Sequence, residues 1–105
     1  MSLSTKQQEF TLAISKLVIY AYEQGYGLTY GDAYRSPKVK YGHKNSTHRS
    51  RLAVDFNIFI GNNYLQGEDA DIAHGVLHDY WITLGGTKRI KGDLNHYSFE
   101  HKGIR

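Results

Sequence analysis

The chain contains no cysteine, a single proline and no long hydrophobic run. Without cysteine it can form no disulfide, and it has no thiolate to act as a nucleophile or a metal ligand. Any metal ion must therefore be held by histidine nitrogens and carboxylate oxygens. The longest apolar run covers only residues 17–22, which is too short for a membrane span or for the core of a signal peptide. We expect no signal peptide and no stable association with a membrane.

The size and charge of the chain set loose limits on its partners. A length of 105 residues suits one domain, and we predict a single monomeric domain over residues 1–105. Lysine and arginine number 13 against 10 acidic residues, which gives a net charge of +3. This mild excess favours approach to anionic polymers such as cell wall or nucleic acid, and it does not select between them.

Two histidines and two aspartates, placed in two short runs of the chain, have the clearest chemical meaning. A catalytic zinc ion usually has three protein ligands, commonly histidines with one carboxylate, and it keeps one position open for water. We predict that His48, Asp55 and His96 are the ligands of one Zn²⁺ ion. Asp93 is not needed as a ligand. It is the predicted general base, which takes a proton from water and returns it to the leaving amine.

The spacing of these residues resembles the signature of a known family. Ser46-x-His48 is followed by six residues and then Asp55, and further along Asp93 precedes His96 with two residues between them. In this order the chain resembles the zinc peptidases of bacterial cell walls, which include D-Ala-D-Ala carboxypeptidases and phage L-alanyl-D-glutamate endolysins. Residues 28–100 contain the whole of the likeness.

Three other segments look most similar to the phage endolysin branch: residues 31–37, residues 52–57 and the glycine pair 85–86. The resemblance implies that three residues bind zinc: His48, Asp55 and His96. It assigns the general base to Asp93. It also implies that Arg35 contacts the substrate or the transition state, and that Ser46 matches the family's serine and contacts the substrate.

The resemblance further implies a substrate and a place of action. The expected substrate is a peptidoglycan stem peptide, cut between L-Ala and D-Glu, and the expected role is lysis of a bacterial host by a phage. Such an enzyme is made in the host cytoplasm and acts on the cell wall after a holin permeabilises the membrane. A D-Ala-D-Ala carboxypeptidase or dipeptidase is the alternative within the same family.

Hydrophobic periodicity predicts two helices. In the first, apolar residues recur at helical spacing after a capping box that begins at Ser4, and the pattern stops at Gly25. The second spans residues 68–84, with acids in its first turn. Its His74 and His78 have the i, i+4 spacing of zinc ligands but lack the Glu of the His-Glu-x-x-His motif. We predict that both lie on a solvated helix face.

We predict strands over residues 28–34, 53–60, 64–65 and 94–99. Residues 53–60 alternate between two faces, one of them apolar. In the strand 53–60, the apolar face is expected to pack and the other face, with Asp55, to carry the site. In the last strand, His96 is expected to face the site while Tyr97 packs, and Asp93 must then lie in the preceding turn. The predicted fold class is α+β, a small antiparallel sheet packed against helices with a central zinc cleft.

Two other classes of function compete with the peptidase. The basic stretch from Lys38 to Arg51 is typical of a non-catalytic module that binds nucleic acid. A degenerate relative that binds zinc and cell wall without turnover is the second. Because the ordered pattern of four site residues explains more of the chain, we expect the enzyme, with the stem peptide and not nucleic acid as its partner.

Overall fold

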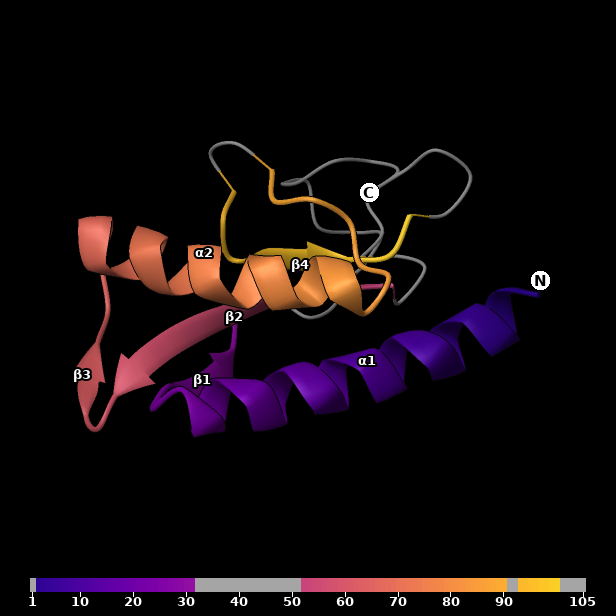
Figure 1. The fold of residues 1–105 in the computed structure, drawn as a ribbon. Helices are drawn as coiled ribbons and strands as arrows, with labels where there is room; N and C mark the ends of the chain where they lie inside the picture. Colours follow the sequence, from indigo (N-terminus) through magenta and orange to yellow (C-terminus); the bar gives the residue numbers. More distant parts are fainter. Residues whose placement is uncertain (1, 32–51, 91–92, 101–105) are drawn as a thin grey trace, which may run out of the picture.

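The computed structural model describes residues 2–31, 52–90 and 93–100 of the chain. These residues form, in order, α1 (Leu3–Glu23), β1 (Gly27–Tyr30), β2 (Ala53–Ile60), β3 (Asn63–Tyr64), α2 (Gly67–Thr83) and β4 (His96–Ser98). Every pair of neighbouring strands is antiparallel. The predicted α+β class, with a small antiparallel sheet packed against helices, is confirmed (Figure 1).

Helix α1 begins at a different cap from the predicted one. The Ser2 side chain accepts a hydrogen bond from the Thr5 amide at 3.2 Å and so satisfies a free N–H of the first turn. The predicted capping box at Ser4 is wrong, because Ser4 already lies inside the helix. The predicted end is confirmed, since the chain leaves α1 through Gly25, whose φ of 88° is in the left-handed region.

Strand β2 lies at the centre of the sheet. Strand β1 pairs along one of its edges, with Tyr30 opposite Phe56. Strands β3 and β4 share the other edge, where β3 pairs with the end of β2 and β4 pairs with its beginning. Residues from three distant parts of the chain therefore meet along one strand.

The observed bounds of the central strand β2 agree with the predicted bounds, whereas those of the outer strands β1 and β4 differ from them. Strand β2 has the predicted bounds, 53–60. Strand β1 ends at Tyr30, and residues 32–34 of its predicted span lie outside the described residues. Strand β4 is shorter than predicted, because Leu94 and Asn95 form a turn and do not continue the ladder.

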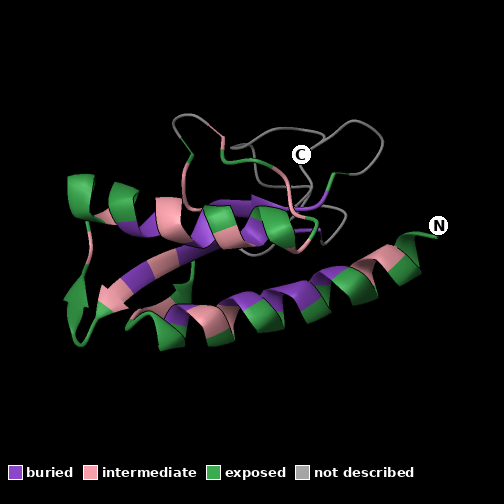
Figure 2. Ribbon diagram, viewed as in Figure 1, coloured by how far each residue is buried: buried purple, intermediate pink, exposed green. Residues whose placement is uncertain are grey.

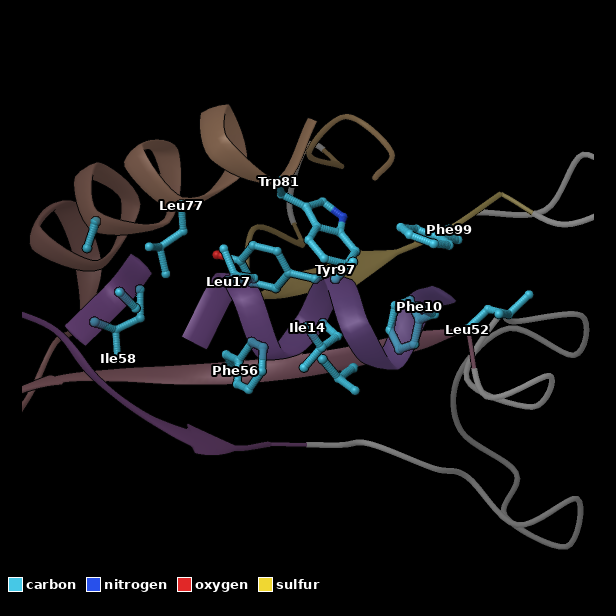
Figure 3. Packing of buried hydrophobic residues seen from close by; sticks show 14 residues of the cluster. Phe10, Ile14, Leu17, Leu52, Phe56, Ile58, Leu77, Trp81, Tyr97 and Phe99 are labelled. Carbon is cyan, nitrogen blue, oxygen red and sulfur yellow. The ribbon is translucent and has the colours of Figure 1, made fainter. Parts of the chain in front are cut away.

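The hydrophobic core lies between the two helices and one face of β2 (Figures 2 and 3). That face presents Val54, Phe56 and Ile58, as the alternation predicted. Trp81 of α2 and Tyr97 of β4 are fully buried among them. Residues of opposite parity on β2, Asp55 above all, therefore point away from the core. Neither of the two described helices is long and apolar enough to cross a membrane.

Candidate metal centre

Asp55 and His96 lie directly opposite each other on neighbouring strands. Asp55 of β2 pairs in register with His96, the first residue of β4. Opposed residues of an antiparallel pair point to the same face, and the two side chains meet there, with Asp55 Oδ1 3.4 Å from His96 Nδ1. Both residues are buried. The sheet thus brings together two of the three predicted zinc ligands.

The separation of these two groups suits a shared metal ion. The heavy atoms of an N–H to O hydrogen bond are usually roughly 2.7–3.2 Å apart, so 3.4 Å is long for a direct bond. Two ligands of one tetrahedral zinc ion, each about 2.0–2.2 Å from the metal, lie about 3.4 Å from each other. Imidazole nitrogen and carboxylate oxygen are also common zinc donors. The residues at this position therefore fit zinc.

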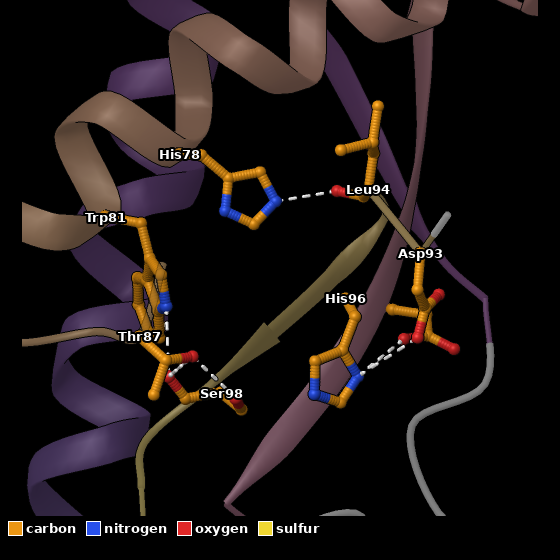
Figure 4. A network of polar contacts seen from close by, with 8 residues as sticks. His78, Trp81, Thr87, Asp93, Leu94, His96 and Ser98 are labelled. Atoms are coloured by element: carbon orange, nitrogen blue, oxygen red, sulfur yellow. Dashed lines mark hydrogen bonds and ion pairs between the residues drawn. The ribbon is translucent and has the colours of Figure 1, made fainter. Parts of the chain in front are cut away.

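Asp93 lies beside this pair, in the turn before β4 as expected. Its amide donates to the Ile90 carbonyl at 2.9 Å, and its own carbonyl accepts from the His96 amide at 3.3 Å. Asp93 Oδ2 lies 3.9 Å from His96 Nδ1 (Figure 4), and its side chain is 51% exposed. A solvent-accessible carboxylate at the edge of a buried acid and imidazole is placed to exchange protons with water.

Gly31 lies beside Asp55 on the edge of β2 that pairs with β1, opposite the edge that pairs with β4. Its amide donates to the Asp55 carbonyl at 2.8 Å and so continues the pairing of β1 with β2. A Cβ atom at position 31 would lie 3.3 Å from Asp55 Cβ and 3.7 Å from Asn57 Oδ1. Glycine therefore leaves space at the base of the Asp55 side chain, and no role of this kind was predicted for it from the sequence.

The α2 histidines do not face solvent, so this prediction is wrong. His74 and His78 are only 5% and 1% exposed. His74 Nδ1 lies 2.7 Å from the Tyr97 hydroxyl. His78 Nε2 lies 2.7 Å from the Leu94 carbonyl oxygen (Figure 4). The cause is the direction in which α2 packs. Its buried stripe of Ala73, Leu77 and Trp81 faces the core, and each histidine directly follows a member of that stripe.

Burial keeps these two imidazoles neutral near pH 7. Desolvation, reinforced by the neighbouring His78, lowers the pKa of His74 to about 4. Desolvation also lowers the pKa of His78, although its hydrogen bond to Leu94 opposes that effect. Because a carbonyl oxygen only accepts, the His78 proton is on Nε2. Burial raises the pKa of the Tyr97 phenol, which stays protonated.

This pair of histidines could have been found in the sequence. The apolar residues Ala73, Leu77 and Trp81 recur every fourth position, and a histidine follows two of them. On a helix, the residue after each member of such a stripe lies about 100° round the axis, at the border of the buried face. The apolar stripe was therefore the signal that the two histidines are buried, whereas the polarity of histidine suggested that they are exposed.

Three predicted site residues, Arg35, Ser46 and His48, lie outside the described residues. Within residues 2–31, 52–90 and 93–100, no group of three or more His, Cys, Asp or Glu side chains could hold a metal ion. The predicted zinc set of His48, Asp55 and His96 includes one residue from outside those ranges. The third ligand and the central zinc cleft therefore stay predictions.

Comparison with known proteins gives no relative for this chain. No protein-family profile, no curated protein and no solved structure matches it. The geometry of Asp55, Asp93 and His96 is therefore the main structural support for a function.

Proposed function

We propose that this chain is a zinc peptidase that hydrolyses an amide bond in peptidoglycan stem peptides. The main support is the buried pair of Asp55 and His96, whose 3.4 Å separation suits two ligands of one zinc ion. His48 is the third ligand in this proposal, which leaves one coordination position for water. When bound, zinc polarises the scissile carbonyl and lowers the pKa of coordinated water to roughly 7.

Asp93 is the proposed proton carrier. Its carboxylate is half exposed and lies 3.9 Å from the His96 ring, so it can accept a proton from the attacking water and pass it to the leaving amine. Asp55 and His96 are buried by comparison, which suits ligands better than a group that must exchange with solvent. Arg35 is proposed to hold a substrate carboxylate or the developing oxyanion, and Ser46 to contact the substrate.

The proposed bond is the one between L-Ala and D-Glu. This choice comes from the likeness of the chain to phage endolysins around Asp55. In that role the protein is made in the cytoplasm of a bacterial host and reaches the cell wall after holin action, so that the host is lysed. The stem peptide is its proposed partner.

Digestion of purified muropeptides, followed by mass spectrometry of the products, tests the proposal. We expect cleavage between L-Ala and D-Glu, and one equivalent of zinc in the protein by elemental analysis. Release of D-Ala alone would instead identify a carboxypeptidase. Zinc without turnover would favour a wall-binding protein, and salt-sensitive DNA binding without hydrolysis would favour a nucleic-acid module. A folded protein with no stoichiometric metal, even after dialysis against excess zinc, would refute the proposal.

The substitution Asp93→Asn separates proton transfer from metal binding. We expect turnover to fall by about 10²–10⁴-fold, because general base catalysis contributes on that order, while the zinc content stays at wild-type level. Asp69→Asn, which makes the same chemical change at an exposed position in the first turn of α2, serves as the matched control and should retain activity. Full activity in Asp93→Asn would remove Asp93 from the mechanism.

A further inference from the structure

Three side chains along one face of α2 hold the strand that presents His96. His74, His78 and Trp81 are all buried, and their i, i+4, i+7 spacing places them on the same side of the helix. His74 contacts the Tyr97 hydroxyl, and the Trp81 indole N–H donates to the Ser98 carbonyl at 3.1 Å. Only the His78 contact reaches the turn between Asp93 and His96 (Figure 4).

That turn is fixed through three consecutive carbonyl groups. The Asp93 carbonyl accepts from the His96 amide at 3.3 Å, and the Asn95 carbonyl accepts from the Phe56 amide of β2 at 2.9 Å. Between them, the Leu94 carbonyl accepts from His78 Nε2 at 2.7 Å. The first two bonds come from the backbone and the third from a side chain. His78 is therefore the side chain through which the helix sets the position of the turn.

The choice of histidine at position 78 is explained by this one bond. The ring stacks on Tyr97, with centroids 4.2 Å apart and planes at 12°, and a phenylalanine could supply the same packing. His78 Nδ1 is buried without a hydrogen-bond partner among the residues that the structure describes. A buried polar atom in that state destabilises the folded protein. A phenylalanine at position 78 would stack in the same way but could not donate the hydrogen bond that Nε2 donates to the Leu94 carbonyl.

We propose that His78 is a positioning residue, which holds the Asp93 carboxylate and the His96 imidazole in their relative places by fixing the Leu94 carbonyl. Its effect on catalysis rests on the proposed peptidase function, whereas its effect on the turn does not. Asp93 and His96 flank the turn at its two ends, so a shift of the Leu94 carbonyl changes the 3.9 Å separation of Asp93 Oδ2 and His96 Nδ1.

Two substitutions at position 78 distinguish the hydrogen bond from the packing. His78→Phe keeps a stacking ring and removes the donor, while His78→Gln removes the ring and keeps an N–H in reach of the carbonyl. The first measurement is amide hydrogen exchange at Asp93 and His96, relative to Leu17 in α1. We expect about tenfold faster relative exchange in His78→Phe, the factor for losing roughly one hydrogen bond, and recovery in His78→Gln.

His74→Phe is the matched control, because it makes the same ring change one helical turn away and removes a bond to a side chain. We expect its relative exchange at Asp93 and His96 to stay at the wild-type level. If His78→Phe also leaves exchange at the turn unchanged, or if His74→Phe raises it as much, the proposal is overturned. This readout needs no activity, so it decides the matter even if the wild-type protein hydrolyses no stem peptide.

The second measurement is the kinetics of stem-peptide hydrolysis. Outer-shell partners of metal sites typically contribute about 10–100-fold to activity. We expect kcat of His78→Phe to fall about tenfold with KM nearly unchanged, because the substrate contacts are intact, and His78→Gln to recover most of kcat. An active wild type together with a wild-type kcat in His78→Phe would overturn the positioning role and leave the proposed peptidase function standing.

Discussion

Substitution of Gly86 by alanine is a direct test of how tightly α2 is packed. A Cβ built on Gly86 would overlap Nε1, Cε2 and Cδ1 of the Trp81 indole. The backbone cannot retreat easily, because the Gly86 amide donates to the Trp81 carbonyl at 3.0 Å. The indole cannot retreat either, since it stacks on Phe99 and meets the Phe10 ring edge to face. An alanine at position 86 must therefore break either the hydrogen bond of the Gly86 amide or the contacts of the indole with Phe10 and Phe99.

The size of the effect follows from the contacts that are lost. Overpacking of a filled core destabilises by about 1–3 kcal/mol, and a displaced indole loses its bond to the Ser98 carbonyl, worth about 1 kcal/mol. That carbonyl still accepts from the Thr87 amide at 2.9 Å, so it is not left without a donor. We expect Gly86→Ala to lower the free energy of unfolding by about 2–4 kcal/mol and Tm by about 10 °C or more.

The chain provides its own probe for this experiment. Trp81 is the only tryptophan, so its fluorescence during urea or thermal unfolding reports on the packed indole itself. Gly75→Ala is the control, because position 75 lies inside α2. Among the described residues, a Cβ there would meet only Arg89 Nη1, at 3.3 Å, which is the end of a flexible side chain. Helix propensity favours that alanine by about 1 kcal/mol. A Gly86→Ala protein with wild-type Tm and emission would refute the packing argument.

Two further predictions concern His74 and Gly31. Because the pKa of His74 is about 4 when folded, against 6.5 as its ordinary value, the unfolded chain takes up the proton first on acidification. The contribution of neutral His74 to the free energy of unfolding should be fully present above pH 6.5 and be lost as the pH falls toward 4. The loss should be at most about 2 kcal/mol at pH 5. His74→Gln should flatten that slope in urea titrations, and an equal slope would contradict the assignment. Gly31→Val should crowd Asp55 and reduce zinc retention on dialysis. Gly27→Ala should not, because a Cβ at position 27 has ordinary contacts at 3.9 Å. Equal zinc retention in the two variants would contradict the role of Gly31.

The sequence predicted those features whose cause is local. The bounds of β2 followed from alternation, because a strand with one buried face must repeat every two residues. The end of α1 at Gly25 followed from the rarity of left-handed backbone in other residues. Within the candidate site, the placement of Asp93 in a turn followed from the same period of two, since Asp93 and His96 would otherwise point to opposite faces.

The features that the sequence did not predict depend on partners far along the chain. Ser2 and Ser4 have the same side chain, and only the backbone conformation decides which one caps α1. His74 and His78 were expected in solvent because imidazole is polar. Their burial depends on the Tyr97 hydroxyl and the Leu94 carbonyl. These groups belong to β4 and to the turn before it, and they meet the histidines only when α2 is packed against that part of the chain.

The meeting of three distant segments at Asp55 has a thermodynamic consequence. Gly31, Asp55 and His96 become neighbours only when β1, β2 and β4 have all paired, so no local fragment contains the arrangement. A ligand held there binds the native state and not the denatured ensemble, and its occupancy is linked to global stability. A ligand bound beside Asp55 would thus raise the free energy of unfolding of the whole domain, including α1 on the far side of the core, which it does not touch.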